Sequence, residues 1–171
     1  MQNNNIILMG FMGVGKGSLA RELAKQTGRI SIDTDDIIES MENTKIKKIF
    51  EQEGEDYFRE KEKNLSVWLE TSVKNSIISI GGGFYHVENL KNIAHVIYLE
   101  SSFDAILDRI NSSEKSKKKF KKRPLLQDMV KAKKLISQRH PKYMASADSV
   151  IQTAGKTSVQ LTEEIIDLLK L

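Results

Sequence analysis

The sequence of 171 residues contains no cysteine, which excludes disulfide bonds and metal sites built from thiolates. No apolar run approaches the ~20 residues that a helix needs to cross a bilayer, so we expect no membrane partner. The first residues (MQNNN) lead directly into an apolar segment, and we expect no secretory signal peptide and a cytoplasmic protein. The histidines, His86, His95 and His140, are not spaced like metal ligands, and we assign them no catalytic role.

The net charge of +4 comes from one segment rather than from the whole chain. Residues 115–123 (KSKKKFKKR) hold seven basic groups and no acidic one, and without them 20 basic and 23 acidic groups remain. A nucleic-acid-binding surface needs basic residues spread over a face, with aromatic residues among them, and only Phe120 interrupts this run. We therefore expect no nucleic-acid partner and interpret most of these lysines as a solvated loop.

Length and periodicity predict one α/β domain that spans residues 1–171. A sequence that is 39% hydrophobic and 29% charged is typical of a folded globular protein with a single core. Strand and helix signals alternate along it, which favours a three-layer domain with a parallel sheet. The predicted strands are 6–9, 29–32, 76–80, 94–99 and 149–152. The predicted helices are 14–27, 34–42, 46–52, 55–71, 103–110 and 126–143, and a last one that a Thr157–Gln160 capping box begins. In three of them the apolar spacing predicts the buried face: Phe58, Leu65, Trp68 and Leu69; Met129, Val130, Leu135 and Ile136; and Leu161, Ile165, Leu168 and Leu169.

The glycine-rich stretch Gly10–Ser18 (GFMGVGKGS) predicts a phosphate-binding loop. It follows the apolar run Ile6–Met9 and precedes a helical pattern, which is where a P-loop lies between a first strand and a first helix. Glycines let backbone N–H groups converge on a phosphate, the helix N-terminus adds partial positive charge, and Lys16 can reach the outer phosphates. An ordinary glycine turn is the alternative. The residue after the lysine, whose hydroxyl usually binds Mg²⁺, is Gly17, and the next hydroxyl belongs to Ser18.

Two further polar segments follow predicted strands. Because ligands of parallel α/β sheets bind beyond the carboxyl ends of the strands, we expect Asp33-Thr34-Asp35 and Gly81-Gly82-Gly83 to share a crevice with the P-loop. One carboxylate can face a metal and phosphates while the other accepts a proton from a substrate hydroxyl. Two alternatives stay open: Asp33 caps the next helix, and the glycines form only a flexible turn.

Two arginines and a lysine-rich segment complete the set of candidates. The guanidinium groups of Arg59 and Arg139 suit a carboxylate, although a surface ion pair is the default reading of each. Residues 112–122 are low in apolar content and cannot bury themselves, which predicts a mobile lid at about 111–124. Arg123 ends this segment, from where it can reach a transferring phosphoryl group.

Taken together, these segments resemble the shikimate kinase family. The matching motifs are GFMGVGKGS at 10–18, DTD at 33–35, GEDYFRE at 54–60, GGG at 81–83, RPLL at 123–126 and RHPKY at 139–143. The resemblance implies a P-loop kinase fold with a five-stranded parallel sheet in the order 2-3-1-4-5. It also implies a monomer that uses ATP and Mg²⁺ to phosphorylate the 3-hydroxyl of shikimate, in aromatic amino-acid biosynthesis.

The resemblance also implies roles for individual residues. The shikimate contacts are Asp35, Arg59, Gly82, Gly83 and Arg139, with the acceptor-binding helices at about 34–60. The phosphate contacts are Gly13, Val14, Gly15, Lys16, Gly17 and Ser18. The residues on the γ-phosphoryl group are Lys16 and Arg123, which with Asp35 form the catalytic set. Neighbours of the adenine are Arg109 and the loop 153–156, including Lys156.

The sequence departs from the family pattern in two places. Gly17 stands where a hydroxyl residue normally binds Mg²⁺, and Ser18, about 100° further round the helix, is expected to face the α-phosphate instead. Water and Asp33, acting through water, could complete the metal shell, so we expect Gly17 to weaken metal binding or turnover without abolishing it. The lid is longer and richer in lysine than usual, and its charge could concentrate ATP and anionic shikimate locally.

Two other functions stay open at this point. A gluconate-type P-loop kinase also binds an acceptor with a carboxylate, so the arginines alone do not exclude it. A catalytically weakened protein that binds nucleotide or RNA would account for Gly17 and the basic lid. The chain still contains residues that serve phosphoryl transfer, which argues against this second reading: Lys16, Asp35, Arg59, Arg123 and Arg139.

Overall fold

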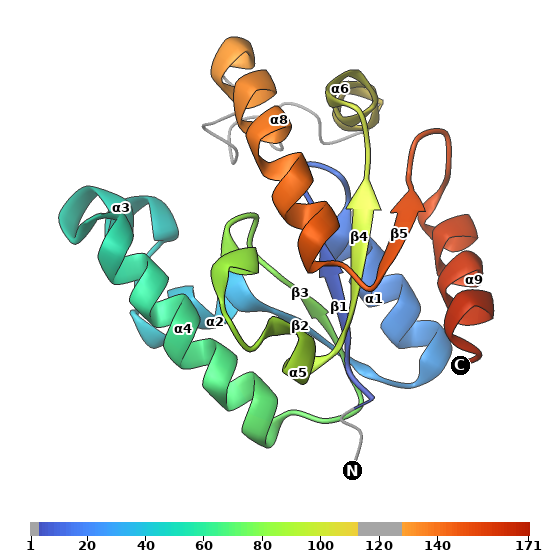
Figure 1. Ribbon diagram of the computed structural model, residues 1–171, viewed down its shortest axis with the longest axis horizontal. Helices are drawn as coiled ribbons and strands as arrows, with labels where there is room; N and C mark the ends of the chain where they lie inside the picture. Colours follow the sequence, from blue (N-terminus) through green and yellow to red (C-terminus); the bar gives the residue numbers. More distant parts are fainter. Residues whose placement is uncertain (1–3, 113–127) are drawn as a thin grey trace.

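A computed structural model describes residues 4–112 and 128–171 of the chain. Its centre is a five-stranded parallel sheet in the order β2-β3-β1-β4-β5, which confirms the predicted fold class (Figure 1). The strands are β1 (Ile6–Met9), β2 (Ile30–Asp33), β3 (Ser76–Ser79), β4 (His95–Glu100) and β5 (Ser149–Gln152).

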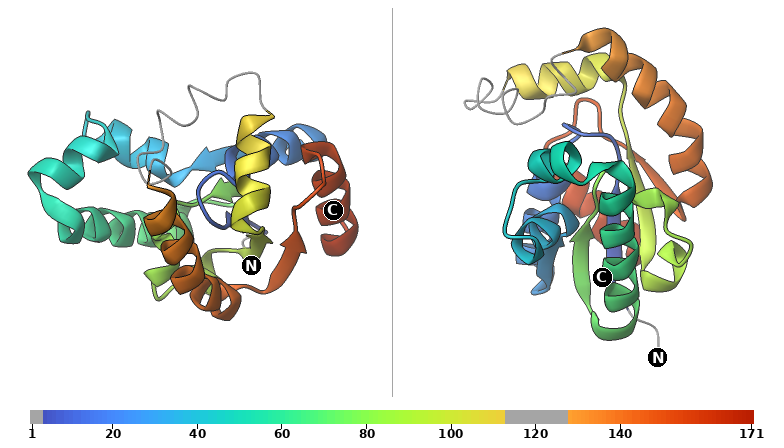
Figure 2. Two further views of the ribbon diagram at one scale, coloured as in Figure 1. Left: turned by 90° about the horizontal axis from the view of Figure 1, so that it is seen from above. Right: turned by 90° about the vertical axis from the view of Figure 1, so that its left-hand side faces the viewer.

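The helices cover both faces of this sheet. They are α1 (Lys16–Thr27), α2 (Thr34–Met41), α3 (Ile46–Gln52), α4 (Gly54–Ser72), α5 (Leu90–Ile93), α6 (Phe103–Asn111), α8 (Met129–Ser146) and α9 (Ser158–Leu169), together with the 3₁₀ helix η1 (Phe84–His86). Helices α1 and α9 pack on one face, whereas α4, α5 and α8 lie on the other (Figures 1 and 2).

The central strand β1 shows why the sheet must be covered on both sides. Its four residues are all buried, and successive side chains point to opposite faces. Ile7 and Met9 belong to the core under α4, α5 and α8, while Ile6 and Leu8 belong to the core under α1 and α9. Both apolar layers therefore hold the carboxyl ends of the strands at fixed positions.

Several predicted details match the structure. The strand 149–152 and the helix 46–52 have the predicted bounds, and Thr157 and Gln160 form the predicted capping box of α9. The first helix begins at Lys16, two residues later than predicted, because Gly15 is its N-cap with a φ of 107°. The short elements η1 and α5 were not predicted.

The apolar stripes of three helices were predicted only in part. Phe58, Leu65 and Leu69 of α4 are buried as expected, but Trp68 lies off this stripe and is 45% exposed. Leu161 and Ile165 of α9 are buried, whereas Leu168 is 49% exposed.

The predicted inward face of α8 is wrong in its first turn. Met129 and Val130 are 44% and 80% exposed, because that turn extends beyond the end of the sheet (Figure 1). Part of the helix predicted at 126–143 lies outside the described residues.

Candidate active site

The P-loop connects β1 to α1 at the carboxyl end of the sheet (Figure 1). Gly13 has a φ of 89°, and a Cβ there would lie 2.8 Å from the side chains of Ile106 and Ile110 on α6. Val14 is buried in the core, so this residue can offer only its backbone to a ligand. Since the first N–H groups of a helix have no partner within it, the start of α1 is a ready anion site.

The ammonium group of Lys16 lies across this loop. Its Nζ donates to the carbonyl oxygens of Gly10 at 2.7 Å and Phe11 at 3.3 Å. Its charge opposes the rise in the pKa of Asp35 that burial causes, so the ammonium and that carboxyl group lie near each other. The structure therefore brings the first and second predicted segments together.

Asp33 has two structural partners. Its Oδ1 accepts a hydrogen bond from the backbone N–H of Asp35 at 3.0 Å, so the alternative that Asp33 caps α2 is correct. Its Oδ2 accepts a hydrogen bond from Ser79 at 2.9 Å. A Cβ on Gly17 would lie 3.8 Å from this Oδ2 and 3.5 Å from Nη1 of Arg21, so Asp33 caps its helix and also faces the P-loop.

The carboxyl group of Asp35 is unusually easy to protonate. Burial raises its pKa to about 7, and the neighbouring carboxylate of Asp33 adds to the rise, while Lys16 opposes it. A carboxyl group with a pKa near neutrality suits a group that accepts a proton during a reaction.

Each glycine of the triplet after β3 faces a different functional side chain. A Cβ on Gly81 would lie 2.5 Å from Oδ1 of Asp35, and one on Gly82 would lie 3.0 Å from Nη1 of Arg139. On Gly83, a Cβ would collide with the guanidinium group of Arg59. The glycines are therefore needed because three charged groups approach the backbone closely.

Hydrogen bonds hold the triplet in place, so it is not merely a flexible turn. The backbone N–H of Gly81 donates to Oγ1 of the buried Thr34 at 3.0 Å. The hydroxyl of Tyr143 donates to the carbonyl oxygen of Gly82 at 2.6 Å. Helices α2 and α8 thus fix the same turn from two sides.

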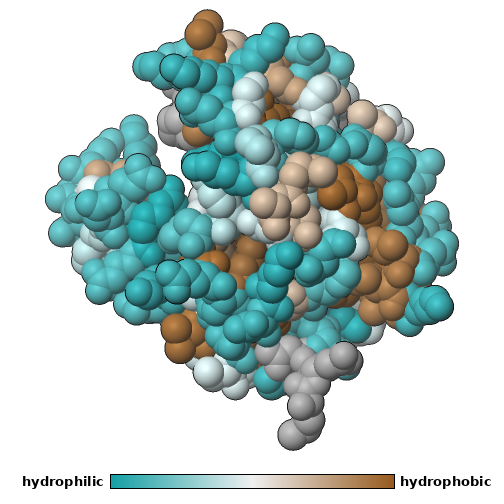
Figure 3. Space-filling model, in the orientation of Figure 1, coloured by the Kyte–Doolittle hydropathy of each residue, from teal (hydrophilic) through white to brown (hydrophobic). Residues whose placement is uncertain are grey.

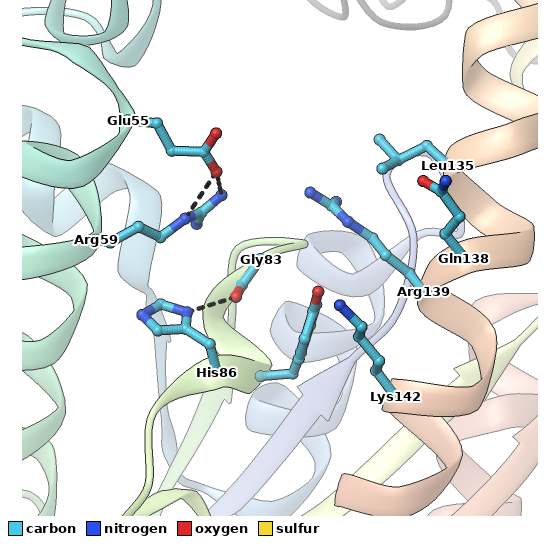
Figure 4. Close-up of a pocket in the computed structure, with 9 residues that line it drawn as sticks. Glu55, Arg59, Gly83, His86, Leu135, Gln138, Arg139 and Lys142 are labelled. Atoms are coloured by element: carbon cyan, nitrogen blue, oxygen red, sulfur yellow. Dashed lines mark hydrogen bonds and ion pairs between the residues drawn. The ribbon is translucent and has the colours of Figure 1, made fainter.

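A pocket of about 180 Å³ opens between α4 and α8 (Figure 4). Its walls are Glu55 and Arg59 on α4 and Leu135, Gln138, Arg139 and Lys142 on α8, and its floor is Gly83, Tyr85 and His86. The two predicted arginines point toward each other across it (Figure 4). Figure 3 shows a largely hydrophilic notch between the part of the molecule that contains α4 and the part that contains α8.

Arg59 is held by two carboxylates. Its Nη2 and Nε donate to Oε1 of Glu55 at 2.6 and 3.1 Å, and its Nη1 donates to Oε2 of Glu62 at 2.6 Å. Glu62 is 1% exposed, and burial raises its pKa, although the ion pair with Arg59 opposes the rise. Arg59 therefore forms the expected surface ion pair with Glu55, but its ion pair with Glu62 is buried.

Sequence reasoning missed two residues that support this pocket. Glu62 lies within the apolar stripe of α4, and an acidic residue at a core position is a signal that could have identified it. Tyr143 is the last residue of the RHPKY motif, but the sequence is equally consistent with a tyrosine that only packs in the core. His86 lines the pocket, its Nδ1 lies 2.7 Å from the carbonyl oxygen of Gly83, and we still assign it no catalytic role.

Arg109 links the P-loop to the loop after β5. Its Nη2 donates to the carbonyl oxygens of Thr153 at 2.5 Å and Lys156 at 3.0 Å, and a Cβ on Gly15 would lie 3.5 Å from its Nη1. The side chain of Lys156 pairs with Glu164 of α9 at 2.6 Å. The structure thus brings these two predicted neighbours of the adenine together, while the ammonium of Lys156 is engaged elsewhere.

The described residues offer few ligands for the implied Mg²⁺. Within residues 4–112 and 128–171, no group of three histidine, aspartate or glutamate side chains could hold a metal ion. Asp33 supplies one carboxylate beside the P-loop, and Gly17 supplies no side chain. This set fits an ion held mainly by nucleotide phosphates and water, which is how Mg²⁺ commonly binds.

Two other expectations concern the rest of the chain. Arg123 and most of the predicted lid lie outside the described residues. In the part of the chain that the structure describes, no helix is long and apolar enough to span a membrane.

Comparisons with known proteins agree on one family. The family model described as shikimate kinase matches residues 12–170. A shikimate kinase from Helicobacter hepaticus is 37% identical over 163 residues, which cover 95% of this chain and 94% of that protein.

Solved structures give the same result. The shikimate kinase from Acinetobacter baumannii in complex with shikimate has a TM-score of 0.84 and 33% identity, covering 98% of this chain and 93% of that one. A gluconokinase from Sinorhizobium meliloti, with a TM-score of 0.57 and 13% identity over 99% of this chain and 93% of that one, shares the fold alone. On the family match over nearly its whole length and these relatives, the chain belongs to the shikimate kinase family.

Proposed function

We propose that this chain transfers the γ-phosphoryl group of ATP to the 3-hydroxyl of shikimate, giving shikimate 3-phosphate and ADP in aromatic amino-acid biosynthesis. The observation that carries this proposal is the close approach of Asp35, Arg139 and Arg59 to three consecutive glycines beside a P-loop. This arrangement supports a site in which Asp35 accepts a proton and the two arginines bind a carboxylate. The shikimate-bound relative from Acinetobacter baumannii supports the same acceptor.

The substrate would lie in the pocket between α4 and α8. Arg59 and Arg139 bind its carboxylate from opposite walls, since a planar guanidinium can form two parallel hydrogen bonds to a carboxylate. The backbone of Gly82 and Gly83 lies against the ring, where the absence of a Cβ leaves room. The reacting hydroxyl then faces Asp35 and the P-loop.

The chemical step requires a proton acceptor and stabilisation of negative charge. The 3-hydroxyl oxygen bonds to the γ-phosphorus, the bond to the β–γ bridging oxygen breaks, and Asp35 takes the hydroxyl proton. Lys16 and the N–H groups of residues 13–18 hold the phosphates. Arg123 is proposed to contact the γ-phosphoryl group from the lid.

Mg²⁺ bound to ATP would neutralise part of the charge on the β- and γ-phosphates. Asp33 is the side chain that would hold the ion's water shell, since its Oδ2 lies beside Gly17. Ser18, which is exposed, is proposed to face the α-phosphate. Arg109 and the loop 153–156 are proposed to flank the adenine.

We further propose that residues 1–171 act as one kinase domain, with a lid at about 111–124. We propose a monomer, as the resemblance to the family implies. A reaction that consumes ATP supports a cytoplasmic location, where ATP is abundant.

A coupled assay of ADP production tests the function directly. We expect ADP release to depend on shikimate, because the chain belongs to the shikimate kinase family. Gluconate in place of shikimate should give no comparable rate. ADP release that depends on gluconate would favour the gluconate-type alternative. ATP binding without shikimate-dependent ADP release would identify a catalytically weakened nucleotide-binding protein.

The pKa of Asp35 predicts a pH dependence. Because the carboxyl group must be ionised to accept a proton and its pKa is about 7, kcat/KM should fall about tenfold for each pH unit below 7 and level off above it. The Asp35→Asn variant should lose about 10²- to 10⁴-fold in kcat. Asp167→Asn, which changes an exposed carboxylate of α9 that does not act on Asp35, is the control and should keep the parent profile. A flat profile from pH 6 to 8 would contradict this role.

Gly17 predicts weak metal binding that one added hydroxyl can improve. A Cβ at this position makes only ordinary contacts of 3.5 and 3.8 Å, so the chain should tolerate both Gly17→Ser and Gly17→Ala. Gly17→Ser should lower the Mg²⁺ concentration at half-maximal rate by about three- to tenfold, the worth of one extra polar contact. Gly17→Ala adds the Cβ without the hydroxyl, and identical Mg²⁺ titrations for the two variants would refute the idea.

A further inference from the structure

We propose that Lys142 is a third cationic contact for the carboxylate of the substrate, and that it adds to the positive charge of the acceptor pocket. This inference rests on the proposed function, because it concerns the same pocket. It assigns a role to a residue of the RHPKY segment other than Arg139.

The first step is the position of Lys142 on α8. Leu135, Arg139 and Lys142 follow one another at spacings of four and three residues, and Gln138 lies three residues after Leu135, which places all four on one face of the helix. All four line the pocket, and Lys142 lies one turn beyond Arg139 (Figure 4). The two cations therefore face the same space from the same wall.

The second step is the charge of the opposite wall. Arg59 makes ion pairs with two carboxylates of the same helix, Glu55 and Glu62, so its single positive charge is more than offset when both are ionised. Arg139 and Lys142 on α8 add two positive charges, so three cations face two carboxylates around the pocket, which favours a monoanionic substrate.

The third step is that Lys142 remains available to a ligand. Its ammonium lies 5.7 Å from the ring centroid of Tyr85, and this ring packs edge-on against Tyr143 at 5.4 Å. Within residues 4–112 and 128–171, no carboxylate forms an ion pair with Lys142. The ammonium therefore lies over the ring of Tyr85, and because Lys142 is exposed, its charge remains open to an incoming anion.

The test compares shikimate with its uncharged methyl ester by isothermal titration calorimetry. Lys142→Met should raise the dissociation constant of shikimate about fivefold and should change that of the ester less than twofold, because only shikimate carries the charge. The variant should raise KM for shikimate with little change in kcat, and Lys142→Arg should retain most of the affinity. Lys133→Met, on the far side of α8, is the matched control and should bind like the parent.

Two outcomes would overturn the inference. If Lys142→Met binds shikimate as tightly as the parent, the lysine makes no contact with the carboxylate. If the variant loses equal affinity for shikimate and the ester, Lys142 acts through packing against Tyr85 rather than through charge. A parent chain that does not bind shikimate at all would instead refute the proposed function, so the two failures are distinguishable.

Discussion

The close approach of three charged side chains to one glycine turn is the constraint on which the site depends. Asp35 comes from α2, Arg59 from α4 and Arg139 from α8, and each meets a different glycine of the triplet after β3. These helices are far apart in the sequence, and the turn is where they meet. Any side chain on the triplet would occupy the space of a functional group.

The rest of the fold serves this turn by fixing its position. Strand β3 lies between β2 and β1, so the triplet emerges between Asp33-Thr34-Asp35 and the P-loop. The two apolar layers hold these strand ends, and the hydrogen bonds from Gly81 to Thr34 and from Tyr143 to Gly82 hold the turn itself. The electrostatic effect of Lys16 on Asp35 follows from this packing.

The sequence predicted the fold, and it predicted which segments the structure brings together, because both leave local signals. Apolar runs, glycine breaks and strand ends locate the sheet, and the polar segments after the strands locate the crevice. Helix faces were harder to predict: the periodicity places Trp68 and Val130 in the core, but they are 45% and 80% exposed. The burial of Glu62 and the hydrogen bond from Ser79 to Asp33 depend on tertiary neighbours, which one sequence does not reveal.

The most direct test of this account is the Gly81→Ala variant, assayed for turnover and for ADP binding. The added methyl group would lie 2.5 Å from the carboxylate of Asp35 and must displace it. Since a misplacement of about 1 Å can cost about 10²-fold in rate, we predict a loss of at least tenfold in kcat with ADP affinity within about twofold of the parent. A variant with the parent's kcat would contradict the claim that this close approach positions the reacting group.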